Sequence, residues 1–369
     1  MSEREAIVIG GGLAGSTTAI HLARAGKDVL LLEKSRGPHD KVCGEFLSGE
    51  ALQELRRLGV DPKDHNAHAI DRVTISAADK HAEARLPFEA LSLTRRTLDE
   101  LLLKRAEAEG VDVQRGQIVT GVSGKTISLR HSEKINGRSV VIATGKHDVR
   151  THKRPEGVHH GLVGLKVFAP PTPELGKVLQ GTVAIDFFPG GYCGFQLVED
   201  GRINACMAVE KGAMGDATEP LAVFRKLAET SALADAILKN GTDGLRLMAI
   251  ANIPYGLVRT QTNDTYYVGD QAAVIPSFCG EGMGIALRSG RLAAEAILAG
   301  EGPSDFQARF AKLVARRVGW TAELSRRLTR PALQSLAVSA AAAAPWAVTR
   351  LAALTRTPNT SALLTNEMH

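Results

Sequence analysis

Three glycines and one acidic residue near the start of the chain have the types and the spacing of a dinucleotide-binding site. Gly10 permits a tight turn after an apolar run, and Gly12 lets the backbone approach a pyrophosphate closely. Gly15 allows the helix that follows to pack on its strand. Glu33 ends a second apolar run and can accept hydrogen bonds from the hydroxyls of a ribose. The pattern therefore predicts a dinucleotide site whose phosphates face a helix N-terminus.

A second set of residues could carry the reaction. Cys43 or Glu45 could donate a proton to a substrate, although a free cysteine can equally fill a small apolar space and a glutamate can anchor a loop. Glu281 could donate a proton or could interact with the dipole of a helix start. Tyr192 could face a substrate pocket or belong to the core of a strand. We take Cys43, Glu45 and Tyr192 as the candidate catalytic residues.

Residues 146–160 are rich in histidine, lysine and arginine. Metal ligation needs paired ligands on a rigid element, and a segment that contains proline does not supply one, so no metal site is predicted. The preferred interpretation is a solvated basic connection. The alternative is that this segment attracts a phosphate of NAD(P)H.

The predicted dinucleotide site requires a parallel sheet to position it. Residues 5–35 show the pattern of a strand, a helix and a second strand, and residues 139–145 indicate a buried parallel strand in the same sheet. Residues 265–270 indicate a further strand, and residues 282–299 a long helix. These elements belong to a Rossmann-like unit.

The rest of the chain shows a different pattern. Strands and turns alternate between residues 159 and 210, which is typical of an antiparallel sheet. One helix is predicted over 217–238 and one strand over 246–254. The dipeptides that begin at Gly124 and Asn136 are turn signals in a hairpin-like stretch.

Composition and charge narrow the class of protein. The 369 residues are 44% hydrophobic and carry a net charge of +5 that forms no long basic block, so nucleic acid is not an expected partner. Four cysteines without paired spacing, and a first strand that leaves no room for a signal peptide, favour a cytoplasmic protein. Residues 331–349 are uncharged, and Pro345 interrupts them. They favour a packed or surface-attached helix, with peripheral membrane contact through the C-terminal helices, over a membrane span.

The segment from Gly269 to Gly284 resembles the late Gly-Asp motif of the FAD-dependent aromatic hydroxylases and geranylgeranyl reductases, which share one flavoprotein fold. In these families the acid, here Asp270, lies against the ribityl and pyrophosphate part of FAD. The helix start that follows favours the negative charge of reduced flavin. Arg95 matches an arginine that approaches the FAD, and the segment Lys41-Val-Cys-Gly-Glu45 resembles the Cys-Gly segment of the reductases.

The resemblance implies that FAD is the resident cofactor. The residues expected to contact it are Gly10, Gly12, Leu13, Ala14, Gly15, Glu33, Lys34, Lys41, Cys43, Arg95, Thr144, Gly145, Gly269, Asp270, Gly280, Gly282, Met283 and Gly284.

The resemblance also implies an α/β fold that consists of a Rossmann-like FAD-binding domain, an inserted antiparallel substrate domain and a helical C-terminal tail. The expected ranges are 1–75, 93–158 and 255–300 for the FAD-binding domain, 76–92 and 159–254 for the substrate domain, and 301–369 for the tail.

The implied activity is that of an FAD-dependent oxidoreductase acting on a lipophilic or aromatic small molecule, with the flavin reduced by transiently bound NAD(P)H. Reduction of a carbon–carbon double bond is favoured, because the Cys-Gly and Gly-Glu-Gly segments match the reductases. The alternative is a flavin monooxygenase that hydroxylates an aromatic or polyketide-like substrate, and the remote alternative is a non-enzymatic FAD-binding redox sensor. The paired-tryptophan motif of flavin halogenases is missing from the sequence, whose tryptophans are Trp320 and Trp346.

Overall fold

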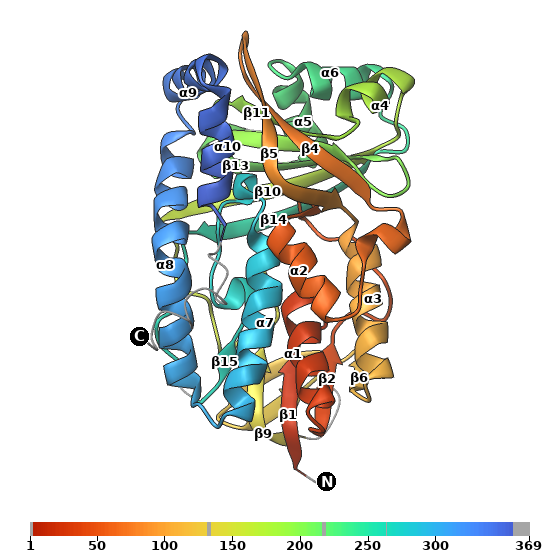
Figure 1. Ribbon diagram of the computed structural model, residues 1–369, viewed down its shortest axis with the longest axis vertical. Coiled ribbons are helices and arrows are strands. Elements are labelled where there is room, and N and C mark those ends of the chain that lie inside the picture. The colour runs from red at the N-terminus through yellow and green to blue at the C-terminus, as the bar shows by residue number, and fades with distance from the viewer. Residues whose placement is uncertain (1–2, 131–133, 216–218, 263, 357–369) are drawn as a thin grey trace, which may run out of the picture.

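The structure is a computed structural model that describes residues 3–130, 134–215, 219–262 and 264–356. It contains two β-sheets, one above the other in Figure 1, with helices packed around both. The two sheets come from interleaved parts of the chain. Residues far apart in the sequence therefore meet between them.

The N-terminal sheet has the strand order β6-β2-β1-β9-β8-β7, with β15 beside β9. Strands β6, β2, β1, β9 and β15 are parallel, as expected for a Rossmann-like unit, and β7 and β8 add an antiparallel extension. The strands span Arg4–Ile9 (β1), Val29–Glu33 (β2), Asp112–Arg115 (β6), Val119–Ser123 (β7), Thr126–Leu129 (β8), Ile135–Ile142 (β9) and Tyr266–Tyr267 (β15).

Four helices accompany this sheet. Helix α1 packs against α3 on one side and α7 on the other, and α2 packs against α7. The helices span Leu13–Arg24 (α1), Gly49–Arg57 (α2), Arg95–Ala108 (α3) and Gly282–Leu298 (α7).

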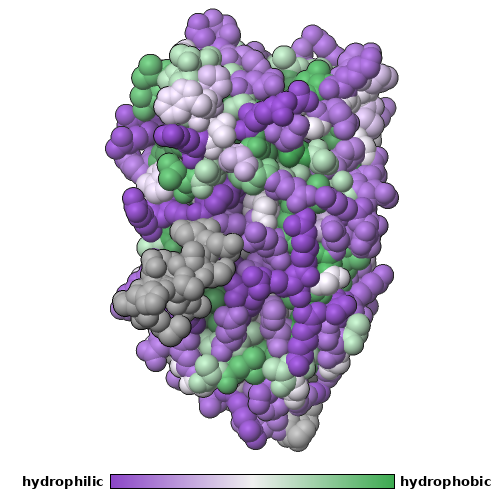
Figure 2. Space-filling model, in the orientation of Figure 1, coloured by the Kyte–Doolittle hydropathy of each residue, from purple (hydrophilic) through white to green (hydrophobic). Residues whose placement is uncertain are grey.

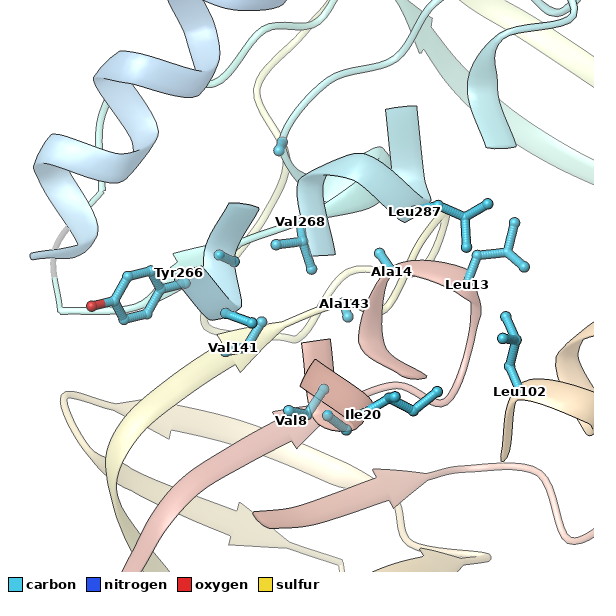
Figure 3. Packing of buried hydrophobic residues seen from close by; sticks show 14 of the residues in the cluster. Val8, Leu13, Ala14, Ile20, Leu102, Val141, Ala143, Tyr266, Val268 and Leu287 are labelled. Atoms are coloured by element: carbon cyan, nitrogen blue, oxygen red, sulfur yellow. The ribbon is translucent and has the colours of Figure 1, made fainter. Parts of the chain in front are cut away.

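Apolar side chains from these helices and strands form one core, seen in Figure 3. Val8 and Val141 from the adjacent strands β1 and β9 lie there with Ile20 of α1. Residues 6–9 of β1 and 140–142 of β9 are fully buried, which explains why these parts of the two strands are apolar runs rather than alternating patterns.

The second sheet has the order β14-β10-β13-β12-β11-β4-β5-β3 and is antiparallel except for the parallel pair β11 and β4. The predicted antiparallel sheet is therefore confirmed. The strands span Phe46–Leu47 (β3), His68–Ala77 (β4), Lys80–Ser92 (β5), His159–Ala169 (β10), Thr182–Phe188 (β11), Gly191–Leu197 (β12), Ile203–Glu210 (β13) and Arg246–Tyr255 (β14).

Helices cover both faces of the second sheet. Residues of α4 (Pro173–Leu179), α5 (Pro220–Ala228) and α6 (Ala232–Lys239) share a core with strands β10 to β13. The tail forms α8 (Pro303–Arg327), α9 (Pro331–Ala343) and α10 (Pro345–Leu354), of which α9 and α10 pack against β5. Short 3₁₀ turns lie at Pro62–His65 (η1), Lys211–Met214 (η2), Gly269–Gln271 (η3) and Ser277–Cys279 (η4).

Two local predictions are wrong. The single helix expected over 217–238 is two helices, because Ser231 ends the first stretch and caps α6 by accepting a hydrogen bond from the Ala234 amide. The turn expected at Asn136 lies inside β9. Gly137 is needed there for close packing, since a Cβ on it would lie 2.8 Å from a side-chain carbon of Ile7.

Two further observations concern the predicted ranges. Strand β4 begins at His68, so residues 68–75, which the sequence assigns to the FAD-binding domain, lie in the second sheet. Within the described residues no helix alone has the length and hydropathy needed to cross a bilayer. Helices α9 and α10 reach that threshold only as a pair, and the pair is bent by 108°.

Candidate active site

A cavity of about 590 Å³ lies between the two sheets, within the size range of cofactor sites. It brings together most of the predicted cofactor-binding residues, which come from the carboxyl ends of β1, β2 and β9, the segment after β2, the turn after β15 and the starts of α1, α3 and α7. Those that line it are Gly10, Gly12, Leu13, Ala14, Glu33, Lys34, Lys41, Cys43, Arg95, Thr144, Gly145, Gly269, Asp270, Gly280, Gly282 and Met283.

Three predicted site residues lie outside this lining. Gly15 faces the turn before α1, where a Cβ would lie 1.9 Å from the carbonyl oxygen of Gly10, so its role is helix packing. Gly284 leaves room for the carboxylate of Glu281. Tyr192, predicted to be catalytic, is buried, and its hydroxyl is 2.6 Å from Ser277 Oγ. The structure does not bring Tyr192 into the cavity, because Ser277 stands between them.

The glycine turn has the shape that a pyrophosphate needs. Gly10 has a φ of +108°, and a Cβ there would lie 2.5 Å from the carbonyl oxygen of Ala143. A Cβ on Gly12 would point at the Arg95 guanidinium and the Lys41 ammonium, 3.4 and 3.7 Å away. Two cations and the N-terminus of α1 thus surround the same small space, which fits a dianionic pyrophosphate.

Glu33 is fixed at the expected position by the backbone. Its Oε2 accepts a hydrogen bond of 2.7 Å from the Gly11 amide, and its Oε1 accepts one of 2.8 Å from the Ser35 amide. A carboxylate has about four acceptor positions, so both oxygens keep capacity for ribose hydroxyls. The residue fits the adenosine end of FAD.

Arg95 is held in place by an ion pair with Asp99. The guanidinium donates to both oxygens of Asp99 at 2.8 and 3.0 Å, and Lys41 donates to the same carboxylate at 2.6 Å. Burial lowers the pKa of Arg95, but Asp99, Cys43 and Asp270 outweigh that effect and leave the pKa raised. Arg95 stays charged, and Asp270 lies close enough to contribute.

Gln271, which was not among the predicted site residues, links two segments on the side of the cavity where the predicted cofactor-binding residues lie. The buried side chain of Gln271 donates to the carbonyl oxygens of Gly145 and His147 at 2.8 and 3.1 Å. It therefore fixes the segment after β9 against the Gly269-Asp270 turn.

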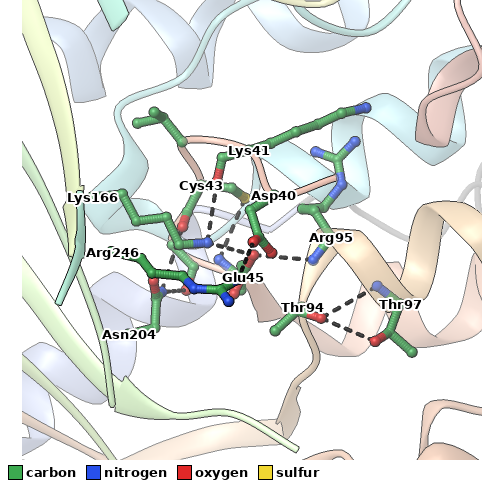
Figure 4. A network of polar contacts seen from close by, with 12 residues as sticks. Asp40, Lys41, Cys43, Glu45, Thr94, Arg95, Thr97, Lys166, Asn204 and Arg246 are labelled. Carbon is green, nitrogen blue, oxygen red and sulfur yellow. Dashed lines mark hydrogen bonds and ion pairs between the residues drawn. The ribbon is translucent and has the colours of Figure 1, made fainter. Parts of the chain in front are cut away.

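The segment that contains Cys43 and Glu45 is held from the second sheet (Figure 4). Lys166 of β10 makes an ion pair of 2.5 Å with Glu45 Oε1, and both side chains are fully buried. Lys166 also donates to the carbonyl oxygen of Lys41, and Asn204 of β13 donates to that of Gly44 at 2.9 Å. The second sheet thus positions the segment that faces the cofactor half.

Glu45 combines burial with access to the cavity. Its Oε1 also accepts a 3.0 Å hydrogen bond from the Arg95 amide, whereas its buried Oε2 has no hydrogen-bond partner among the described residues. Burial raises the pKa of Glu45 to about 7, against the opposing effect of Lys166. A carboxyl group in this setting can hold and release a proton near neutral pH.

Two cysteines, Cys43 and Cys206, line the cavity together with Glu45. Cys43 lines the cavity, and its Sγ accepts a 3.3 Å hydrogen bond from the Glu45 amide. Cys206 lines the cavity from β13, and burial raises the pKa of its thiol to about 12. Cys206 is therefore a protonated thiol rather than a nucleophile.

A second buried carboxylate stands behind the start of α7. Glu281 pairs with Arg356, which also donates to the carbonyl oxygens of Cys279 and Gly280 at 3.0 and 3.3 Å. Burial and the neighbouring Glu50 raise the pKa of Glu281 well above its usual range, although Arg356 opposes them. Gly280 and Gly282 line the cavity but Glu281 does not, so this acid anchors the loop from behind.

The wall that the second sheet contributes is mostly apolar. Met207, Met248, Ile250 and Ile253 line it, and Tyr255 stands at its edge. These residues could not be identified from the sequence, because an inward-facing apolar residue of a strand has the same pattern whether it meets a core or a cavity.

Lys166 did leave a signal in the sequence. It is a lone lysine in the apolar run Leu162–Ala169, and a charge in such a strand is retained only when it is paired.

Comparisons with known proteins agree with this geometry. A family model described as an FAD binding domain matches residues 3–138. The menaquinone reductase of Mycobacterium tuberculosis is 26% identical over 345 residues, covering 88% of this chain and 83% of its own. The digeranylgeranylglycerophospholipid reductase 2 of Methanopyrus kandleri is 26% identical over 351 residues, covering 88% and 84%. The FAD binding domain and the two reductases together show that the chain is an FAD-dependent oxidoreductase.

Solved structures show how widely this FAD-dependent oxidoreductase fold occurs. A geranylgeranyl bacteriochlorophyll reductase-like protein from Thermoplasma acidophilum superposes with a TM-score of 0.73 at 19% identity, covering 92% of this chain and 91% of its own. The flavin-dependent brominase Bmp2 superposes with a TM-score of 0.76 at 17% identity, covering 96% and 93%. At these identities the similarity establishes the fold and leaves the reaction open.

Proposed function

We propose that this FAD-dependent oxidoreductase reduces a carbon–carbon double bond in a lipophilic substrate. The observation that carries the proposal is Glu45, a buried acid with a pKa near neutrality where the cofactor half of the cavity meets its apolar wall. A reductase needs such a proton donor. The two reductases named above, at 26% identity over most of the chain, support the same reaction class.

In the proposed reaction the cofactor supplies the hydride and a side chain of the protein supplies the proton. Gly10, Gly12, Arg95 and Asp270 would hold FAD, which when bound and reduced would supply hydride chemistry at one carbon of the double bond. Glu45 gives its proton to the other carbon, and the carboxylate that remains is stabilised by Lys166. Glu45 regains a proton from water before the next turnover. Cys43 lines the cavity beside Glu45, and we assign it the role of fixing the Glu45 backbone amide.

The apolar wall supports a lipophilic substrate. Met207, Met248 and Ile250 offer dispersion contacts and no charge, which suits a chain-like or aromatic group. The names of the two reductases specify menaquinone and a digeranylgeranylglycerophospholipid, and we propose for this protein a lipophilic substrate with a prenyl chain.

We further propose that NAD(P)H reduces the flavin by transient binding. Lys34 and Lys146, which line the cavity, supply positive charge for its phosphates. We place the enzyme in the cytoplasm, since its four cysteines are free thiols.

An anaerobic titration tests the reaction. The yellow protein is bleached with NADPH and then mixed with a short-chain menaquinone or a digeranylgeranyl glycerophospholipid. The proposal predicts that the flavin absorbance returns and that the prenyl chain of the product gains two hydrogens by mass spectrometry. Product that forms only in air, with substrate-stimulated oxygen uptake and a gain of one oxygen, would instead establish a monooxygenase.

The cofactor site has its own test. We expect Asp270→Ala to lower the fraction of protein purified with FAD, because the carboxylate lies at the cavity beside Arg95. An Asp270→Ala protein that retains full FAD contradicts the assignment of this residue.

A further inference from the structure

Helices α9 and α10 pack on β5 with one side and present on the other an apolar surface that no element among the described residues covers. Leu336, Trp346 and Leu354 are 66%, 64% and 67% exposed, and Leu351 is 44% exposed. No residue of α10 is buried, although eight of its ten residues, all of which the structure describes, are uncharged and apolar or proline. An isolated exposed leucine is ordinary, but an apolar helix without a buried residue needs a partner.

The charges on this surface have one sign. Residues 331–356 contain no acidic residue, and Arg350 stacks on the ring of Trp346 at 5.5 Å. Arg330, at the start of α9, is exposed as well. Figure 2 shows hydrophobic and near-neutral residues at the upper left, where Figure 1 places α9 and α10. An apolar patch bordered by arginine and tryptophan is typical of contact with the headgroup region of a bilayer.

From this surface we infer that the bent pair α9–α10 docks on a membrane that contains anionic lipids. The pair has the hydropathy of a span, but its 108° bend and its packing on β5 keep it on one side of the bilayer. A second copy of the chain is a poorer occupant, because a two-fold contact through this face would bring arginines against arginines.

Docking here would place the bilayer next to the cavity. Arg356, two residues beyond α10, donates to the carbonyl oxygens of Cys279 and Gly280, and Gly280 lines the cavity. The surface is therefore connected directly to the loop at the start of α7. This inference does not depend on which lipophilic molecule is the substrate.

Vesicle binding of the full-length, FAD-loaded protein tests the inference. We expect it to sediment with vesicles of phosphatidylcholine and phosphatidylglycerol, and to sediment less as salt is added. Trp346→Ser combined with Leu354→Ser should weaken this binding by at least about tenfold. The matched control is Val178→Ser combined with Leu298→Ser, two residues 59% and 42% exposed on α4 and α7, which should bind like the parent.

A spectroscopic measurement does not depend on the stability of these variants. In a Trp320→Phe protein, Trp346 is the sole tryptophan. Its emission should shift to shorter wavelength when anionic vesicles are added. The inference is overturned if the parent protein does not sediment with these vesicles, if both double variants lose binding equally, or if the Trp346 emission does not move. It is also overturned if Trp346→Ser abolishes a dimer in solution while vesicle binding is unchanged.

Discussion

Two buried glutamates beside the cavity differ in what surrounds them. Glu45 lines the cavity and pairs with Lys166. Glu281 is outside the lining, pairs with Arg356 and lies against the carboxylate of Glu50. Burial raises the pKa of both, so burial alone does not distinguish a proton donor from an anchor.

The two acids differ in whether the carboxyl group can transfer a proton into the cavity. Glu45 lines the cavity, and burial, opposed by Lys166, raises its pKa to about 7. Glu281 shares its surroundings with a second carboxylate and holds the loop whose glycines face the cavity. Variants of the two acids should therefore change different quantities, the rate in one case and the stability of the loop in the other.

The largest effect is expected for Glu45→Gln. Replacing a general acid by an amide of the same shape should lower turnover with a prenyl substrate by about 10²- to 10⁴-fold, because the amide donates no proton to carbon. Stopped-flow absorbance should show unchanged reduction of the flavin by NADPH and slow reoxidation by substrate.

The matched control is Glu54→Gln, a buried glutamate of α2 that pairs with Arg291 and does not line the cavity. We expect its turnover per bound FAD to equal that of the parent. Equal losses in the two variants would mean that Glu45 has a structural role only.

Lys166→Met should have the second largest effect. Removing one partner of a buried pair costs about 3–5 kcal/mol of unfolding free energy, measured by denaturant titration at pH 8. Because the ammonium lowers the pKa of Glu45, its loss should raise that pKa further. The cost should shrink toward pH 6, where Glu45 is neutral.

The double variant Lys166→Met, Glu45→Gln tests the coupling. It should recover part of the lost stability, since no charge then remains buried alone. Strictly additive losses would show that the pair is not coupled.

A smaller effect is expected for Arg356→Met. The loop before α7 would lose a donor to two carbonyl oxygens and to Glu281, which should cost about 1–3 kcal/mol and weaken FAD retention. The pH dependence of turnover should not move, because Glu45 is untouched. Arg350→Met, on the exposed side of α10, is the control and should leave FAD retention unchanged.

The cofactor half could be predicted from sequence because its determinants are local. Gly10, Gly12 and Glu33 stand at fixed offsets around one strand and one helix, so their spacing specifies the turn and the acid. Asp270 and Arg95 could be predicted only through the family resemblance, because they are far from the glycine turn in the sequence and reach it only in the folded chain.

The reaction half could not be predicted in this way. Glu45 meets Lys166 across 121 positions, and Arg356 meets Glu281 across 75. No local pattern records such pairs. Tyr192, a predicted catalytic residue, lies outside the cavity lining, and its hydroxyl bonds inside the core to Ser277 and Tyr255.

The sign of the pH effect follows from the pKa of Glu45. Its folded-state pKa of about 7 lies above the ordinary value of 4.5, so between these values the folded chain holds a proton that the unfolded chain has released. Stability contributed by this group therefore falls as pH rises through that window. In the folded protein, the protonated form of Glu45, which is the active one, is lost as pH rises past about 7.

The most direct test is the pH profile of substrate-driven flavin reoxidation, measured anaerobically between pH 5.5 and 9 in the parent protein and in Glu45→Gln. We expect the parent rate to fall about tenfold per pH unit above about pH 7 and this decline to be missing in the variant. A parent rate independent of pH across this range, or the same decline in both proteins, would contradict Glu45 as the proton donor.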